Sequence, residues 1–277
     1  MTKTGIANDR RVGSDRRQKK DAAFADELAE AIATRSIEIL FQPQFDSAGD
    51  RRLVGAEALA RWRHPRLGSL GGDELFTMAE RAGESCLLAR HVAGAALLEA
   101  SKWPQVPGRP LRLSLNVTAA DLAEAHFAEE MGGKIAVTRF PPELLTLEIT
   151  EQSLVDDLER SARRLRPLAD LGVRIALDDF GAGFCNFHYL KRLPLHYLKL
   201  DRSMVEGIVE SASDLAVLRG IMAMARALGL EVTAEGIERE SQREVIAREG
   251  CTSWQGFLGA HPMSAMEFAA LVQQPAG

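Results

Sequence analysis

Short apolar runs alternate with longer amphipathic stretches along the chain from about residue 22 onward. The runs are rich in Leu, Ile, Val and Phe and are typical of strands that are partly or wholly buried. They cover residues 37–46, 53–62, 111–117, 144–150, 174–180, 197–201, 230–237 and 254–259. Apolar residues recur with helical spacing in the stretches 22–36, 73–83, 86–103, 121–131, 153–172, 213–229 and 241–250. Gly ends several of these predicted helices, which agrees with its preference for helix C-termini.

Eight strands that alternate with helices over about 250 residues predict a (β/α)8 barrel, a TIM-like α/β fold. A doubly wound open sheet is the alternative, because periodicity shows neither barrel closure nor strand direction. No linker rich in Pro, Gly or Ser divides residues 21–277, so we expect one domain there. Residues 1–20 hold seven Lys or Arg and two Asp. We expect them to form a basic, disordered tail, with contact to an anionic partner as the less favoured interpretation.

Charge and cysteine content limit the class of protein. The chain has 34 basic and 39 acidic residues, so 27 basic and 37 acidic residues lie beyond the tail, a net charge of −10. This acidic body argues against binding of a nucleic-acid polymer. No apolar run approaches the roughly 20 residues of a membrane span, and the first residues lack the apolar core of a signal peptide. Cys86, Cys185 and Cys251 are far apart in sequence, which favours reduced thiols in the cytoplasm over disulfides or zinc.

Polar residues recur near the C-terminal ends of the predicted strands. Because side chains alternate along a strand, six of the predicted strands carry such a residue on one face. These residues are Glu57, Asn116, Glu148, Asp178, Lys199 and Glu235. Alternation also places Asp201 on the face of Lys199. In a parallel barrel the C-terminal strand ends meet at one mouth, where the active sites of this architecture lie.

Carboxylates that converge in this way repel one another in a low dielectric, and divalent cations would relieve the repulsion. Oxygen donors without clustered His or Cys favour Mg²⁺ or Mn²⁺. A single acid of this kind is more often part of a salt bridge than a metal ligand, but recurrence on five or six strands favours a cation site. The six histidines show no HxH or HExxH spacing, and we assign none of them to a metal.

Seven motifs follow one another in the sequence: EALAR at 57–61, LNV at 115–117, LEITE at 147–151, DDFGAGF at 178–184, LKLDRSMV at 198–205, AEGIE at 234–238 and QGFLGAHP at 255–262. Together they resemble the EAL family of cyclic di-GMP phosphodiesterases, over roughly residues 24–272. The resemblance implies a barrel with one antiparallel strand and two divalent cations, Mg²⁺ or Mn²⁺. It also implies hydrolysis of the bacterial second messenger cyclic di-GMP to linear 5′-pGpG by a cytoplasmic homodimer.

The resemblance also assigns roles to individual residues. One cation would be held by Glu57, Asn116, Glu148 and Asp178, and the second by Asp178, Asp179 and Glu235. Lys199 would lie beside the attacking water, and together with Glu57 and Glu235 it makes up the expected catalytic set. Gln42, Arg61 and Gln255 would contact the substrate, while Glu151 and Glu238 would support the loops around the site.

The loop after the paired aspartates departs from the family pattern at Ala182, Cys185 and Asn186, which we expect to alter the rate or the coupling within a dimer. Two alternatives remain: a sensor that binds cyclic di-GMP without cleaving it, and a protein-interaction module. The complete set of six proposed ligands together with Lys199 favours catalysis.

Overall fold

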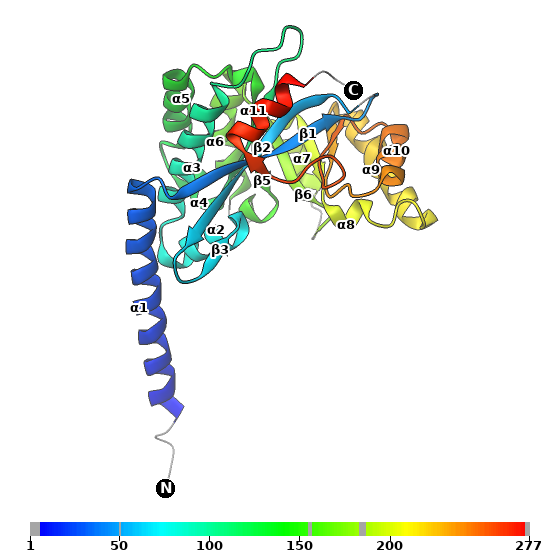
Figure 1. Cartoon of the computed structure of the whole chain (residues 1–277). Coiled ribbons are helices and arrows are strands. Elements are labelled where there is room, and N and C mark those ends of the chain that lie inside the picture. Colours follow the sequence, from blue (N-terminus) through cyan, green and yellow to red (C-terminus); the bar gives the residue numbers. More distant parts are fainter. Residues whose placement is uncertain (1–5, 50, 155–156, 183–186, 275–277) are drawn as a thin grey trace. The chain divides into compact units, whose positions relative to one another are not determined.

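A computed structural model describes residues 6–49, 51–154, 157–182 and 187–274. Its helices are α1 (Ile6–Ala33), α2 (Gly72–Ala82), α3 (Ser85–Ala100), α4 (Ala119–Ala123), α5 (Phe127–Thr138), α6 (Leu158–Asp170), α7 (Phe187–Arg192), α8 (Arg202–Val205), α9 (Ala212–Leu228), α10 (Glu240–Glu249) and α11 (Ala265–Gln273), with 3-10 turns η1 (Pro142–Leu144) and η2 (Gln152–Leu154) (Figure 1). Its strands are β1 (Ile37–Asp46), β2 (Leu53–His64), β3 (Gly68–Leu70), β4 (Arg112–Val117), β5 (Leu145–Thr150), β6 (Arg174–Phe180), β7 (Tyr197–Leu200), β8 (Glu231–Ala234), β9 (Ser253–Trp254) and β10 (Met263–Ser264).

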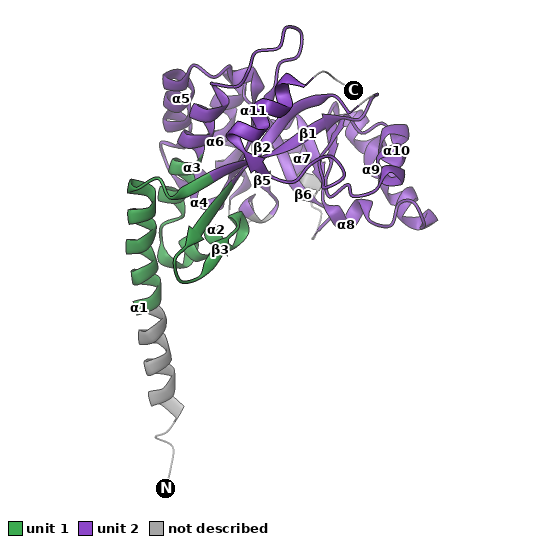
Figure 2. Cartoon of the chain, viewed as in Figure 1, with its two compact units in different colours: residues 1–38, 60–92 green, residues 39–59, 93–277 purple. Residues whose placement is uncertain are grey.

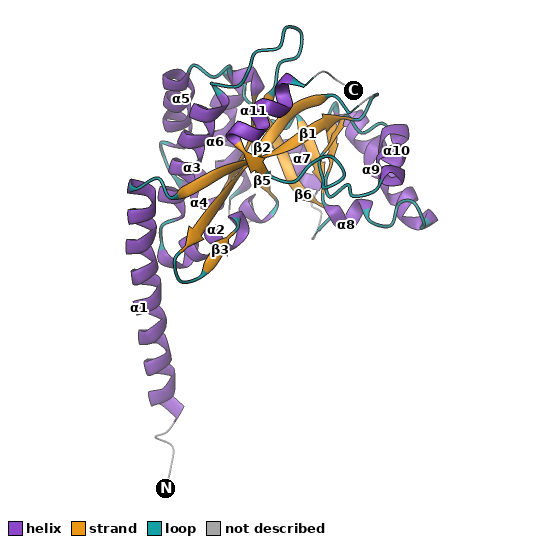
Figure 3. Cartoon of the chain, viewed as in Figure 1, coloured by secondary structure: helices purple, strands orange, loops and turns teal. Residues whose placement is uncertain are grey.

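Eight of these strands close into a barrel, which confirms the predicted fold class. Strands β2, β4, β5, β6, β7, β8 and β9 pair in parallel in that order. Strand β1 pairs with β2 and runs antiparallel to β9, so it closes the barrel and is the one strand of opposite direction. The short strands β3 and β10 pair antiparallel with β2 and β1, respectively. In Figure 3 helices of the second unit, such as α5, α6, α9 and α10, lie outside the strands of that unit.

The chain divides into two compact units (Figure 2). The first consists of residues 1–38 and 60–92, and the second, residues 39–59 and 93–277, contains most of the barrel. In the first unit, Phe24 of α1 packs against Trp62 of β2, with ring centroids 5.7 Å apart. Helix α1 runs across the predicted boundary at residue 20, and the division of the chain into tail and domain stays a prediction.

The barrel strands of the second unit bury apolar side chains on their outer face. Leu113, Leu115, Leu147, Ile175 and Leu198 are buried, in alternation with the polar residues that the sequence placed on the opposite face. This alternation gives the helices an apolar surface to cover, while the interior of the barrel receives the polar groups.

The sequence pattern did not predict helix α11, which packs against the second unit through aromatic side chains. Phe268 lies 5.9 Å from Phe41 of β1 and 4.6 Å from Trp103, measured between ring centroids. All three rings are buried. Aromatic pairs at this separation add about 0.5–1.5 kcal/mol each beyond the burial of their area. Of the helices in the described part of the chain, none is long and apolar enough to cross a membrane.

Candidate functional site

The ammonium group of Lys199 lies at the centre of the polar barrel interior in the second unit. Its Nζ atom is 2.5 Å from Glu148 Oε2, 2.7 Å from Glu235 Oε1, 3.1 Å from Asp178 Oδ1 and 3.6 Å from Glu57 Oε2. These residues come from β7, β5, β6, β2 and the segment after β8, so five different chain segments supply one cluster. The Lys199 side chain is only 2% exposed, so the cluster lies largely out of water.

The electrostatics of this cluster follow from burial and mutual repulsion. Burial raises the pKa of Glu148 to about 8, because Lys199 offsets only part of the effect and Glu57 and Asp178 add repulsion. Burial likewise raises the pKa of Asp178 and of Glu235. Burial alone would lower the pKa of Lys199, but the surrounding carboxylates outweigh it and raise that pKa well above the ordinary value.

Glu57 differs from its neighbours because amide groups stabilise its charge. Asn116 Nδ2 donates to Glu57 Oε1 at 2.7 Å, and Gln255 Nε2 donates to Glu57 Oε2 at 2.7 Å. Burial would raise the pKa of Glu57, but the charge of Lys199 and these hydrogen bonds together lower it. Gln255 also donates to Glu235 Oε1 at 3.0 Å and accepts from Gln44 Nε2 at 3.0 Å. The amides thus connect β1, β2 and the end of β9 at the same mouth.

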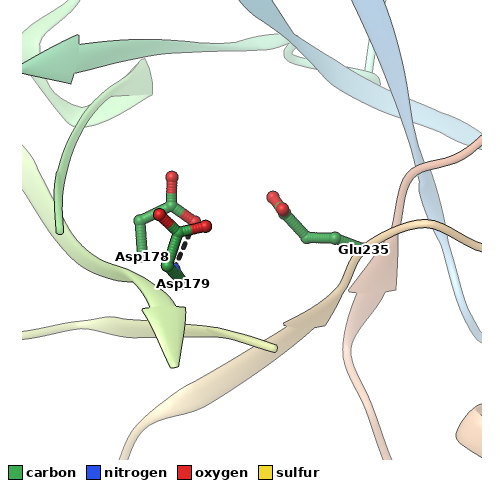
Figure 4. Close-up of side chains that lie close together, drawn as sticks. All are labelled: Asp178, Asp179 and Glu235. Atoms are coloured by element: carbon green, nitrogen blue, oxygen red, sulfur yellow. Dashed lines mark hydrogen bonds between the residues drawn. The ribbon is translucent and has the colours of Figure 1, made fainter. Parts of the chain in front are cut away.

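Asp178 and Asp179 both face this mouth although they are neighbours in sequence. A regular strand would direct them to opposite faces. The pairing of β6 with β7 shifts register between Leu177 and Phe180, and Asp179 has a φ of +56°, in the left-handed region that non-Gly residues rarely adopt. The Asp179 N–H donates to Asp178 Oδ1 at 2.9 Å. Figure 4 shows the two carboxylates side by side, with Glu235 facing them.

These three residues form a group that can hold a metal ion. One oxygen of each of Asp178, Asp179 and Glu235 lies within 4.8 Å of the others. The wider site has five carboxylates, from Glu57, Glu148, Asp178, Asp179 and Glu235, and one ammonium. If all are ionised, the formal charge is −4, equal and opposite to that of two divalent cations. The donor set is oxygen-rich and suits hard cations such as Mg²⁺ or Mn²⁺.

The other predicted site residues have more varied positions. Gln42 is half-buried on β1. Arg61 is exposed and belongs to the first unit, so the structure does not relate it to the cluster. Glu151 is half-buried directly after β5. Glu238 pairs with Arg202 at 2.9 Å, and its backbone N–H donates to Gln242 Oε1.

Two expectations concern residues whose side chains or placement the structure does not describe. The departure from the family loop at Cys185 and Asn186 lies outside the described residues, and so do the side chains of most of the basic tail.

Asp201, expected on the face of Lys199, is instead the N-cap of α8 and accepts a hydrogen bond from the Ser203 N–H at 2.9 Å. Strand β7 ends at Leu200, so alternation no longer applies one residue later.

Sequence reasoning missed Gln44, which is 7% exposed and contacts Gln255. Alternation on β1 puts Gln42 and Gln44 on one face, opposite the buried rings of Phe41 and Phe45. The pattern therefore contained the signal, but it could not show which of the two amides reaches the cluster.

Comparison with known proteins agrees with this geometry. A family profile described as the EAL domain matches residues 25–262. The chain belongs to the EAL domain family.

Relatives of this EAL domain carry names that describe an activity. The bifunctional diguanylate cyclase/cyclic di-GMP phosphodiesterase MucR of Pseudomonas aeruginosa is 32% identical over 246 residues, which is 89% of this chain and 36% of that protein. The cyclic di-GMP phosphodiesterase NbdA of the same organism is 33% identical over 247 residues, 89% of this chain and 31% of that protein. The EAL domain thus spans about a third of the length of these two relatives.

A solved structure supports both the fold and the family. The PaMucR phosphodiesterase in its c-di-GMP complex superposes with a TM-score of 0.81 at 32% identity and covers 88% of this chain and 98% of that one.

Proposed function

We propose that this EAL domain hydrolyses cyclic di-GMP to linear 5′-pGpG. The observation that carries the proposal is the convergence of five carboxylates and Lys199 at one mouth of the barrel. Two named relatives are cyclic di-GMP phosphodiesterases, and a solved relative binds c-di-GMP, which supports the choice of substrate.

The residues present fit a pair of divalent cations. Glu57, Asn116, Glu148 and Asp178 would hold one, and Asp178, Asp179 and Glu235 the other, with Asp178 shared. Such cations supply a nucleophilic water at neutral pH and stabilise charge on phosphoryl oxygens. The amide nitrogens of Asn116 and Gln255 donate hydrogen bonds to Glu57. When a cation binds, each amide would have to turn its oxygen toward the cation or break its hydrogen bond to Glu57.

Lys199 is proposed to position the site. Its ammonium holds the carboxylates of Glu148, Asp178 and Glu235 within 3.1 Å, which keeps them converged before a cation arrives. With its pKa raised, Lys199 stays protonated at cellular pH. It therefore serves as a hydrogen-bond donor and a positive charge, and not as a general base.

Substrate contacts are assigned to the amides at the mouth. Gln255 donates hydrogen bonds to both Glu57 and Glu235, which supports its proposed role as a substrate contact. Its position depends on Gly256, at which an added Cβ would lie 2.2 Å from the Ile237 carbonyl oxygen. Gln42 and Arg61 remain proposed substrate residues on the strength of the family resemblance. The homodimer and the cytoplasmic location also remain predictions.

The deciding experiment is chromatography of the products formed from cyclic di-GMP over time, with Mg²⁺ and separately with Mn²⁺. We expect pGpG to accumulate, because the linear product has lost the macrocycle that fixes both guanines and should bind and be cut less well. Asp178→Asn serves as the inactive control.

The alternatives predict different outcomes in the same assay. Tight binding of cyclic di-GMP with no product would identify a sensor, and neither binding nor product would identify an interaction module. Absence of pGpG with both metals, over protein concentrations that allow a dimer to form, would contradict the enzymatic function.

A further inference from the structure

The barrel contains a small polar cavity directly beneath the Lys199 cluster. Its volume is about 20 Å³, and Glu148 and Lys199 belong to its lining. The lining also contains Arg112, Tyr197 and six small or neutral side chains: Gln44, Ser114, Thr146, Ala176, Thr233 and Ser253. Of the proposed cation ligands, Glu148 alone belongs to the lining of this cavity.

Five strands contribute short side chains to the lining of the cavity. Ser114 is the register partner of Thr146, and Thr233 is the register partner of Ser253. Ala176 is opposite Glu148 and contributes only a methyl group. Barrel interiors of this architecture are usually filled by bulky branched residues, and here hydroxyls and a methyl group leave space instead.

The floor of the cavity is closed by a second polar pair. Arg112 Nη1 donates to the Tyr197 hydroxyl at 2.5 Å, and both residues line the cavity. Arg112 also lies 4.0 Å from Glu231, at the end of the barrel away from the cluster. The cavity is thus bounded by Lys199 and Glu148 above and by this pair below.

Two polar side chains of the lining have an oxygen that takes part in no hydrogen bond between described residues. Thr146 is 4% exposed, and its hydroxyl lines the cavity without taking part in any hydrogen bond found between described residues. Glu148 is 1% exposed, and only its Oε2 atom is bonded, to Lys199. Leaving such groups without a partner costs about 1–3 kcal/mol each, and more for a charged group.

We propose that the cavity binds one water molecule, and that Thr146 is the positioning residue that holds this water against Glu148. A buried water needs about 10–15 Å³ and 2–4 polar partners. The cavity has the volume, and Thr146, Ser114 and Glu148 supply the partners. The water fixes the orientation of the Glu148 carboxylate, whose other oxygen is held by Lys199. This inference rests on the proposed role of Glu148 as a cation ligand.

The test compares Thr146→Val, which keeps the shape and removes the hydroxyl, with Thr146→Ser, which keeps the hydroxyl. Binding of Mg²⁺ alone is measured by calorimetry on the whole chain without cyclic di-GMP. We expect Thr146→Val to weaken Mg²⁺ binding about 10–100-fold, the range seen when the hydrogen-bond partners of metal ligands are removed. We expect Thr146→Ser to bind like the parent. Thr138→Val on α5, whose hydroxyl bonds the Lys134 carbonyl, is the control for loss of a threonine hydroxyl elsewhere.

High-resolution crystal structures of the parent and of Thr146→Val complete the test. We expect an ordered water within hydrogen-bond distance of Thr146 and Glu148 in the parent, and a displaced Glu148 carboxylate in the variant. An empty cavity in the parent, unchanged Mg²⁺ binding by Thr146→Val, or equal loss in both Thr146 variants would each overturn the inference. If the parent itself bound neither Mg²⁺ nor Mn²⁺, the proposed function would fail, and the crystal structures would still decide whether the water is present.

Discussion

Replacement of Lys199 by Met tests whether this ammonium holds the carboxylates together. Methionine has a similar length and no charge, so the substitution removes the cation without opening a large cavity. Four carboxylates within 3.6 Å of Nζ would then lose their only close cation among the described residues. The expected result is a less stable protein whose stability depends more steeply on pH.

The magnitude follows from opposing contributions. Each contact near 3 Å is worth about 5 kcal/mol of attraction at an effective dielectric constant of about 20, and the burial of Lys199 offsets several kcal/mol of the total. Removal of one partner from a buried ion pair typically costs about 3–5 kcal/mol. We expect the free energy of unfolding to fall by about 4 kcal/mol at pH 8, a large part of the roughly 5–15 kcal/mol of a typical domain.

The direction of the pH dependence comes from the raised carboxyl pKa values. Glu148 has a folded pKa of about 8 against an ordinary 4.5, so the folded protein binds more protons than the unfolded chain between these values. This contribution to stability is therefore present at low pH and is lost as the pH rises toward 8. Without Lys199 the carboxyl pKa values rise further, so the variant should lose less stability at pH 5.5 than at pH 8.

Urea unfolding in EDTA, followed by circular dichroism at both pH values, measures these differences. Excess Mg²⁺ should restore much of the loss at pH 8, because a ligand at 100 times its dissociation constant adds about 2.7 kcal/mol. Lys191→Met, at an exposed lysine on α7, is the matched control and should change little. An equal loss at pH 5.5 and pH 8, with no recovery in Mg²⁺, would show that Lys199 contributes packing and not charge.

Other predictions follow from the same geometry. Glu57→Ala or Asp178→Asn should lower turnover of cyclic di-GMP more than about 100-fold without unfolding the chain, since removing even the partners of metal ligands costs 10–100-fold; near-normal rates in saturating Mg²⁺ would refute the ligand assignment. Ca²⁺ alone should bind but support little hydrolysis, because it accepts longer bonds and looser geometry than Mg²⁺, and rapid product formation in Ca²⁺ would contradict this. Mg²⁺ should bind more tightly as the pH rises toward 8, because its ligand Glu148 must lose a proton first, and calorimetry at pH 6 and pH 8 would measure it. Burial and nearby Arg174 lower the pKa of His196, so the contribution of neutral His196 to stability is lost as the pH falls below about 6.5. His196→Asn should therefore reduce the fall in the free energy of unfolding between pH 7 and pH 5, and the same pH dependence in parent and variant would refute this.

Alternation of side chains was sufficient to predict the barrel and the polar face of most of its strands. Ser114, Thr146, Asp178 and Thr233 are buried on the inner side, and the intervening Leu and Ile residues are buried outside. Prediction failed where the strands end. Residues 254–259 were expected to be a strand, but β9 ends at Trp254 because the chain turns at Gly256 against the Ile237 backbone. Helix α11 was missed because its position depends on contacts with Phe41 and Trp103, which are more than 150 residues away.

Asp179 shows most clearly why the site needed the structure. Strict alternation turns Asp179 away from Asp178, and only the family resemblance brought both residues to the cations. In the structure, a register shift in β6 and a left-handed backbone conformation at Asp179 turn the Asp179 side chain toward that of Asp178. Such a conformation costs of order 1–3 kcal/mol for a residue other than Gly, and it persists where the surrounding structure imposes it. Gly181 lies two residues later at φ +104°, with Met204 2.4 Å from the position of an added Cβ, so α8 packs closely against this turn. The carboxylate pair therefore depends on a turn that is held from outside the strand, which is why a rule based on strand geometry alone could not find it.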